Sequence, residues 1–150
     1  NMYMARKYLQ GEYHVINKHK YLGTKPPRYR SSYELECIRW ADTSPNVLKW
    51  SYEQVVVKYY NPVKQRMARY IVDMWIEYKD RNGVTRQALI EIKPYDQTQP
   101  PKKGRKRKQT YMEEVATYMT NQAKWNAAME YAKERDWDFR LLTENSLFRG

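Results

Sequence analysis

The sequence predicts a single α/β domain in which a mixed central sheet is flanked by helices. Its length of 150 residues suits one domain with one hydrophobic core. Capping boxes, in which Ser or Thr is followed three residues later by Glu, mark two helix starts, at residues 31–34 and 110–113. Runs rich in β-branched and aromatic residues, typical of strands, lie between these helices and after the second one. The expected order is an N-terminal arm, a helix, three antiparallel strands, a helix and a strand.

Basic residues exceed acidic ones by 11, because the chain has 28 Lys and Arg against 17 Asp and Glu. Two segments account for this excess. Residues 1–30 hold seven cations against one acid, and residues 102–108 hold six cations and no acid. Such a charge distribution favours a polyanionic partner.

The single cysteine, Cys37, excludes an internal disulfide and a cysteine zinc cluster, and it suits a reducing cytosol. No apolar run approaches the roughly 18 residues of a membrane helix, and residues 1–7 lack the apolar stretch of a signal peptide. We therefore expect a soluble intracellular protein with no membrane partner.

Residues 1–30 form the predicted basic, aromatic arm, which a pair of prolines ends. Its cations could neutralise phosphates while its tyrosines stack or hydrogen-bond, so the arm could lie along nucleic acid, with Arg28 and Arg30 among the contacts. An ordinary solvated arm whose tyrosines pack on the core explains the same pattern. Both interpretations stay open on the sequence alone.

The first helix is expected from Ser31 to about Asp42. Ser31 would cap it and Glu34 would complete the capping box, a purely structural use of this carboxylate. Extended runs should follow the helix at residues 47–50, 53–60 and 66–70. Aromatic and basic side chains of these runs, such as Tyr60 and Arg66, could contact a nucleic-acid backbone or be ordinary exposed strand ends.

Two apolar runs at residues 71–76 and 88–93 contain Asp73, Glu91 and Lys93, although burying an unpaired charge costs several kcal/mol. The turn at residues 80–83 makes them a hairpin. A two-residue loop would place the carboxylates on opposite faces, whereas a three-residue loop with glycine in the left-handed conformation pairs Asp73 with Glu91. We predict the three-residue loop, because adjacent like charges then mark a cation site.

Two adjacent carboxylates suit a hard divalent cation such as magnesium, which prefers oxygen ligands and retains several waters. Such an ion can polarise a phosphoryl oxygen, while Lys93 would stabilise charge on the attacked phosphate or orient the attacking water. The alternative is a simple cross-strand ion pair between Lys93 and a carboxylate on a solvated face.

The strand ends at Pro94, which cannot donate to a ladder, and a basic loop at about residues 95–109 should be mobile until phosphates neutralise it. We expect DNA contact, rather than a localisation signal or a merely solvated loop, from its six cations: Lys102, Lys103, Arg105, Lys106, Arg107 and Lys108.

A long helix is expected from Thr110 to about Arg135, followed by a strand at residues 138–143 and a fraying end from residue 145. Gln122 interrupts the inward stripe of this helix and must satisfy two donors and an amide oxygen. It is either a buried glutamine bonded to backbone or a polar group aimed at the carboxylates. The stripe comprises Tyr111, Val115, Tyr118, Gln122, Trp125, Met129 and Ala132.

Asp73 together with Glu91-Ile92-Lys93 resembles the PD-(D/E)xK motif of the restriction-endonuclease-like nucleases, with Val72 in place of the motif's proline. The whole chain is similar to the head-completion nucleases of T-even-type bacteriophages. The segments that carry this resemblance are residues 8–11, 29–34, 91–94 and 120–125.

The resemblance implies a restriction-endonuclease-like fold over residues 31–150 and a DNA endonuclease that uses Mg²⁺, with Mn²⁺ able to substitute. It implies that Asp73, Glu91, the Ile92 carbonyl and Glu34 hold the metal, that Lys93 assists catalysis and that Gln122 faces the site. It also implies DNA and phage head, portal or neck proteins as partners, and action in the host cytoplasm during assembly or in the virion head or neck.

Two alternatives accompany this hypothesis. One is a non-catalytic DNA-binding protein of head or neck assembly that kept the fold and lost turnover. The other is a nuclease of the junction-resolving or transposon-end type, which has the same chemistry on a different DNA shape.

Overall fold

The structure, a computed structural model, describes residues 9–147. Arg6 and Lys7 of the predicted arm lie outside the described residues, as do residues 148–150 of the expected fraying end. The elements are β1 (Gly11–Glu12), β2 (Arg28–Tyr29), α2 (Ser32–Thr43), β3 (Val47–Tyr52), β4 (Val56–Asn61), β5 (Arg66–Ile71), β6 (Met74–Lys79), β7 (Thr85–Ile92), a 3-10 turn η1 (Tyr95–Thr98), α3 (Lys108–Glu134), β8 (Asp138–Leu142) and α4 (Glu144–Leu147).

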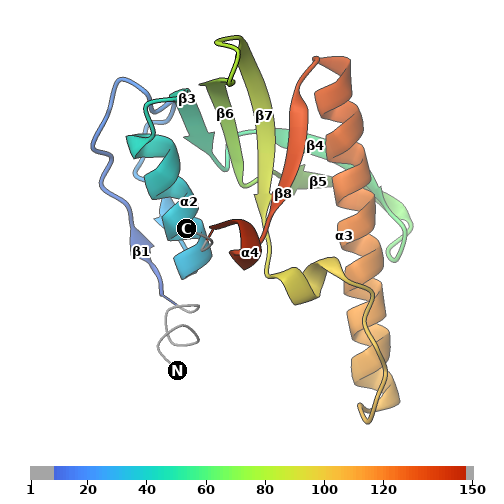
Figure 1. Cartoon of the computed structure of the whole chain (residues 1–150). Helices are drawn as coiled ribbons and strands as arrows, with labels where there is room; N and C mark the ends of the chain where they lie inside the picture. Colours follow the sequence, from blue (N-terminus) through green and yellow to red (C-terminus); the bar gives the residue numbers. More distant parts are fainter. Residues whose placement is uncertain (1–8, 148–150) are drawn as a thin grey trace.

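The central sheet has the strand order β3-β6-β7-β8 and lies between α2 and α3 (Figure 1). Its strands are antiparallel except for β8, which runs parallel to β7. The predicted mixed sheet flanked by helices is therefore confirmed. Parallel pairing is possible because α3 carries the chain back along the sheet between β7 and β8.

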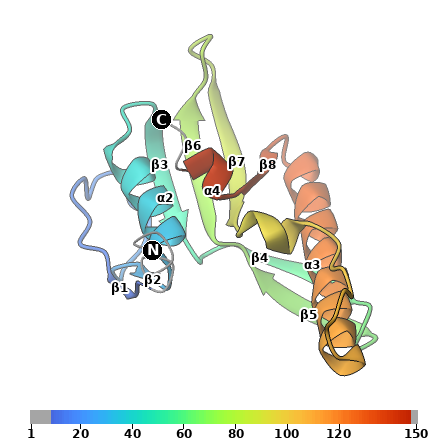
Figure 2. The ribbon, with the colours of Figure 1, turned by 60° about the horizontal axis from the view of Figure 1, so that its bottom comes forward.

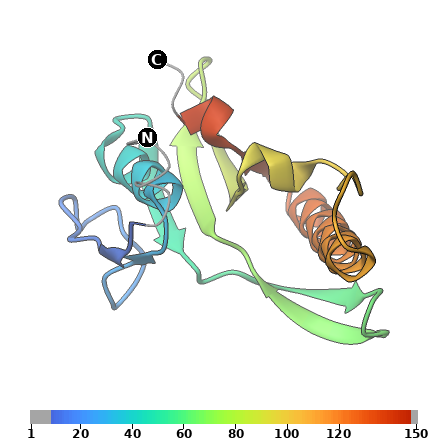
Figure 3. The ribbon, with the colours of Figure 1, turned by 90° about the horizontal axis from the view of Figure 1, so that it is seen from below.

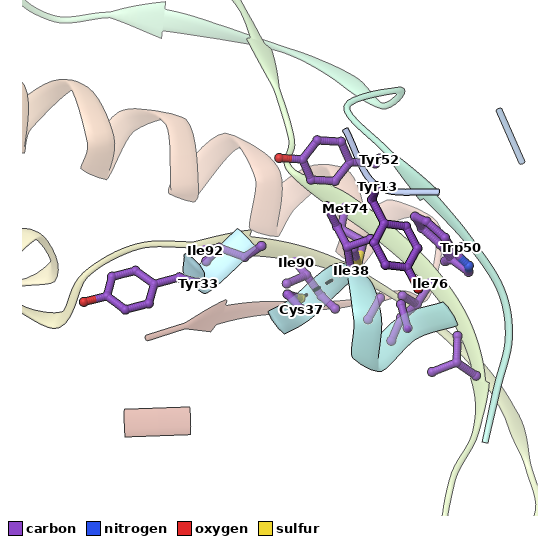
Figure 4. Packing of buried hydrophobic residues seen from close by; sticks show 13 residues of the cluster. Tyr13, Tyr33, Cys37, Ile38, Trp50, Tyr52, Met74, Ile76, Ile90 and Ile92 are labelled. Atoms are coloured by element: carbon purple, nitrogen blue, oxygen red, sulfur yellow. Dashed lines mark hydrogen bonds between the residues drawn. The ribbon is translucent and has the colours of Figure 1, made fainter. Parts of the chain in front are cut away.

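Two hydrophobic cores form on the two faces of this sheet. Successive side chains of a strand alternate between faces, so Ile90 packs with Ile38 of α2 while Leu89 packs with Trp125 of α3. Figure 4 shows the α2 side, where Cys37 and Ile38 lie against the strands. Cys37 is fully buried there, with its Sγ 3.9 Å from the Sδ of Met74.

The β6–β7 hairpin has the predicted three-residue loop. The Asp80 N–H donates to the Val84 carbonyl at 2.9 Å, and Gly83 has φ +75°, which favours glycine. The Asp80 carboxylate also accepts the Asn82 and Val84 N–H groups, which fixes the turn. The register continues to Met74 opposite Ile90, so the next pair of positions is Asp73 and Glu91.

The strands before this hairpin differ from the expectation. Strands β4 and β5 pair with each other in a separate two-stranded sheet, which leaves the central sheet and runs toward α3 (Figure 3). The reason lies at residues 72–74, where Val72 packs in the α3-side core and Met74 in the α2-side core. The chain crosses from one face to the other at Asp73, which a continuous strand could not do.

Two details of α3 also differ. The helix begins at Lys108, and Thr110 does not cap it, because the turn at residues 103–106 delivers the chain directly into the first helical hydrogen bond, from Tyr111 N–H to the Arg107 carbonyl. Met129, expected to face inward, is 46% exposed, and Ala128 is fully buried instead.

Residues 13–21 of the predicted arm pack against the domain. Tyr13 lies in the α2-side core and the ring of Tyr21 lies 4.5 Å from that of Trp50. The carboxylate of buried Asp42 accepts bonds from the Tyr13 hydroxyl at 2.6 Å and from the backbone N–H groups of residues 16 and 17. The structure therefore shows that Tyr13 and Tyr21 of the arm pack on the core.

At the other end, residues 144–147 form α4 rather than fraying, and the Glu144 carboxylate accepts the Tyr95 N–H at 2.6 Å. Within the described part of the chain, no helix has the length and apolar character needed to span a membrane.

Candidate active site

Asp73 and Glu91 meet where β7 ends and the chain crosses from β5 to β6. Glu91 lies close enough to raise the pKa of Asp73, and Asp73 Oδ2 accepts the Ile92 N–H at 2.8 Å. Glu91 is only 5% exposed. The three-residue hairpin loop thus sets the two acids side by side, as the register predicted.

Two aromatic side chains lie against Glu91 on the α3 side. The Trp125 indole N–H donates to Glu91 Oε2 at 3.3 Å. The buried Tyr70 hydroxyl also lies against Glu91, yet it has no well-aligned hydrogen-bond partner among the described residues. Sequence reasoning placed Trp125 in the core stripe and gave Tyr70 no role. The contact of Trp125 with Glu91 could have been predicted, because a buried indole N–H needs an acceptor. The inward stripe of the helix faces the strand that carries this carboxylate.

The electrostatics of the pair disfavour two negative charges side by side. Burial raises the pKa of Asp73 well above its usual value, the Glu91 charge raises it further, and the bond from Ile92 opposes this shift. Burial likewise raises the pKa of Tyr70, and Glu91 adds to the effect. A buried Glu91 and a half-buried Asp73 that share a site, beside a hydroxyl oxygen without a partner, form a donor set that fits a hard divalent cation.

Glu34 lies at the edge of this site. The N-cap half of the predicted capping box is present, because the Glu34 N–H donates to Ser31 Oγ at 3.1 Å. The Glu34 carboxylate accepts the Ser31 hydroxyl and the Arg30 N–H. One carboxylate oxygen also accepts the Tyr52 hydroxyl, and the pKa of Tyr52 is raised by burial and then by Glu34. Glu34 is near enough to contribute to the raised pKa of Asp73. Across residues 9–147, however, no three His, Cys, Asp or Glu side chains come together as a metal-binding group.

Lys93 directly follows β7, and Gln122 lies on α3. Lys93 is half-buried, its N–H donates to the Leu142 carbonyl at 2.9 Å, and its ammonium makes no ion pair within 4 Å with a described carboxylate. The simple cross-strand ion pair is therefore absent here. Gln122 is half-buried, whereas its neighbour Asn121 is the buried amide of α3, with 7% exposure.

The predicted DNA-contacting cations are all exposed, but two of them are engaged by acids. Arg30 Nη1 lies 2.8 Å from Glu53, and Lys106 Nζ lies 2.6 Å from Glu114. The pair with Glu114 ties the loop to α3, and the Lys106 ammonium also donates to the Lys102 carbonyl within the loop. The other six predicted contacts make no ion pair within 4 Å with a described acid: Arg28, Lys102, Lys103, Arg105, Arg107 and Lys108.

Comparison with known proteins identifies the family of the chain. Residues 44–144 match the family model described as the TnsA-like endonuclease N-terminal domain. The chain is also 36% identical over 142 residues to the head completion nuclease of Enterobacteria phage T4, covering 91% of this chain and 92% of that protein. The chain therefore belongs to the TnsA-like endonuclease family, with its restriction-endonuclease-like fold, and to the same family as this phage head completion nuclease.

Proposed function

We propose that this chain is a magnesium-dependent DNA endonuclease that trims or processes packaged DNA ends during phage head completion. Membership of an endonuclease family and 36% identity to a phage head completion nuclease support the nuclease activity and its setting. The observation that carries the proposed chemistry is the Asp73–Glu91 pair, in which Glu91 is buried and the pKa of Asp73 is raised first by desolvation and then by Glu91. A cation that binds both acids would relieve this repulsion.

In this proposal Asp73 and Glu91 hold the ion, the Ile92 carbonyl completes the protein ligands, and Glu34 acts from the edge of the site. When bound, magnesium supplies positive charge that polarises a phosphoryl oxygen and makes bound water more acidic. Manganese would substitute, because it accepts the same oxygen ligands.

The chain's own groups would position the reactants. Lys93, half-buried and free of a described acid, would orient the attacking water or stabilise charge on the phosphate. Trp125 holds Glu91 in place through its N–H. The attack adds water to phosphorus and breaks the bond to one sugar oxygen, leaving a phosphate monoester and a hydroxyl.

The substrate would be held by the basic loop, residues 102–108, and by Arg28 and Arg30. Head, portal or neck proteins would be the protein partners, and the work would take place in the host cytoplasm during assembly or in the virion head or neck. Gln122 would face the site from α3 as a polar group near the reacting phosphate.

The direct test is cleavage of linear, nicked and branched DNA by the purified protein with magnesium, with manganese and with EDTA. We expect cleavage with either metal and none in EDTA, and Lys93→Ala should abolish cleavage while DNA binding persists. The control is Lys133→Ala, on the exposed last turn of α3. DNA binding by the wild type without cleavage under any condition would instead support the non-catalytic alternative.

Trp125→Phe should weaken the apparent magnesium affinity by about tenfold, since a group that orients a metal ligand typically contributes tenfold or more. The phenyl ring keeps most of the packing and removes only the N–H that Glu91 accepts. A magnesium titration of cleavage measures the midpoint.

Trp137→Phe is the matched control, because Trp137 packs against Trp75 and Tyr131 in the same core, away from Glu91. An equal shift of the magnesium midpoint in both variants would contradict the role assigned to the Trp125 N–H.

A further inference from the structure

The two-stranded sheet formed by β4 and β5, residues 56–71, is here called the ribbon. Among the described strands, β4 and β5 pair only with each other. The inner face of the ribbon packs on α3: Tyr59 and Tyr70 are buried, and their rings enclose the Lys124 ammonium at 5.9 and 5.7 Å from the ring centroids. The ribbon is therefore fixed to the domain on one face only.

The outer face of the ribbon is exposed and contains both basic and large apolar side chains. Its central pairs are Lys58 opposite Arg69 and Tyr60 opposite Met67. Tyr60 is 54% exposed and Met67 is 61% exposed. Nothing in residues 9–147 covers these side chains, so the face is available to a partner.

The charge of the ribbon is of one sign. Residues 56–71 contain four cations and no acid, and none of these cations lies within 4 Å of a described carboxylate. Directly opposed like charges, such as Lys58 and Arg69, destabilise a sheet. A polyanion that lies across the pair would remove this repulsion. The cations are Lys58, Lys64, Arg66 and Arg69.

The ribbon is joined rigidly to the two acids. Strand β5 ends two residues before Asp73, the Tyr70 hydroxyl lies against Glu91, and Val72 N–H donates to the Val55 carbonyl at 2.9 Å. At about 3.3 Å per residue, the seven residues from Asp73 to Arg66 span roughly 23 Å. This is about two-thirds of a turn of B-DNA.

We infer that the outer face and the tip of the ribbon bind the DNA duplex beside the cutting site. Lys58 and Arg69 of the outer face, together with Lys64 and Arg66 of the tip, contact phosphates. Tyr60 and Met67 lie against the groove. The inference rests on the proposed function, because it takes DNA as the substrate. A two-stranded ribbon has dimensions that the major groove admits. The bound duplex then extends about seven base pairs from the cut on the ribbon side, at 3.4 Å per base pair.

The test measures binding of a 30-base-pair duplex to the full chain in EDTA, by fluorescence anisotropy, over a range of salt. Two ribbon variants are used: Lys64→Gln/Arg66→Gln at the tip and Lys58→Gln/Arg69→Gln on the outer face. The control, Lys79→Gln/Arg81→Gln, removes the same charge from the exposed β6–β7 hairpin, which lies at the other end of the sheet (Figures 1 and 2). Thermal unfolding checks that all variants fold.

Each phosphate contact contributes about 0.9 to the slope of log affinity against log salt. We therefore expect each ribbon variant to lower the slope by about 1.8, so that the wild type loses about tenfold more affinity than the variant between 50 and 200 mM salt. The control should keep the wild-type slope. If both ribbon variants have the same salt slope as the control variant, the inference is overturned. It is also overturned if the outer face of the ribbon binds a protein rather than DNA.

A second measurement separates this inference from the proposed function. In cleavage assays, the duplex is shortened to fewer than about seven base pairs on one side of the cut, the side that the ribbon would bind. This shortening should lower the cleavage rate of the wild type and change the rates of the ribbon variants little. If the wild type cleaves and shortening the duplex changes the rates of the wild type and the ribbon variants equally, the ribbon inference alone fails. If the wild type neither binds nor cleaves any duplex, the proposed function fails with it.

Discussion

Asp73→Asn is expected to abolish cleavage and, at the same time, to stabilise the metal-free protein. The variant loses a carboxylate that the proposed ion needs, and a loss of several kcal/mol of transition-state stabilisation lowers the rate by about a thousandfold or more. The free energy of unfolding should rise by roughly 1 kcal/mol, because an opposed like-charged pair is removed. The amide oxygen of Asn can still accept the Ile92 N–H, so the local backbone is kept.

The sign of the pH dependence follows from the raised pKa of Asp73. A carboxyl group whose pKa is raised by folding stabilises the protein fully at a pH below its pKa in the unfolded state, which is near 3.8 for Asp73. This stabilisation is lost as the pH rises through the higher pKa of the folded state. The wild type without metal should therefore lose stability relative to Asp73→Asn across that interval. Glu91 and Glu34 face Asp73 and act in the same direction.

Thermal unfolding of both proteins between pH 4 and 8, with and without magnesium, measures these effects. Magnesium should raise the Tm of the wild type, because a ligand that binds only the folded state stabilises that state. It should leave the Tm of Asp73→Asn unchanged, because this variant lacks one of the two carboxylates that would bind the ion. Asp136→Asn is the control, because Asp136 is exposed and its positive φ of 58° also suits Asn. A variant that cleaves at the wild-type rate would refute the assignment of Asp73.

Asp42→Ala is expected to cost about 3–5 kcal/mol of the free energy of unfolding. Asp42 is fully buried, and its carboxylate accepts the Tyr13 hydroxyl and two backbone N–H groups. Alanine leaves these three donors without an acceptor, at about 1–3 kcal/mol each before relaxation. Since domains are stable by about 5–15 kcal/mol, this single change removes a large share.

Denaturant unfolding of the wild type, Asp42→Ala and Asp42→Asn measures the cost. Asn keeps one acceptor oxygen and should lose less than Ala. DNA cleavage at low temperature should be retained by both variants, because Asp42 lies at the end of α2 opposite to Glu34. A change in stability below about 0.5 kcal/mol, the range of ordinary surface substitutions, would show that the three bonds contribute little.

The features that the sequence predicted are those set by local chemistry. The Asp80 to Gly83 turn fixes the loop length and therefore the Asp73–Glu91 pairing, and the Ser31–Glu34 capping box fixes the start of α2. These signals need only a few neighbouring residues. The predicted cross-strand pairing of Asp73 with Glu91 and the first helix accordingly match the structure.

The features that the sequence did not predict depend on distant partners. Asp42 sits in the last turn of a helix, where an acid is ordinarily solvated, and only the return of residues 13–17 buries it. The ribbon separates from the central sheet because Val72 and Met74 pack in different cores. The capping role of Thr110 was wrong because the turn before α3, set by Lys103 and Lys106, places the helix start earlier.

The position of Cys37 has a consequence for the chemical durability of the protein. This thiol, the sole cysteine of the chain, is fully buried beside Met74, and burial raises its pKa. Oxidants and alkylating reagents attack the thiolate, so they reach this sulfur only when the domain opens. The folded protein should therefore tolerate air without a reducing agent and resist covalent cross-linking between copies through this sulfur.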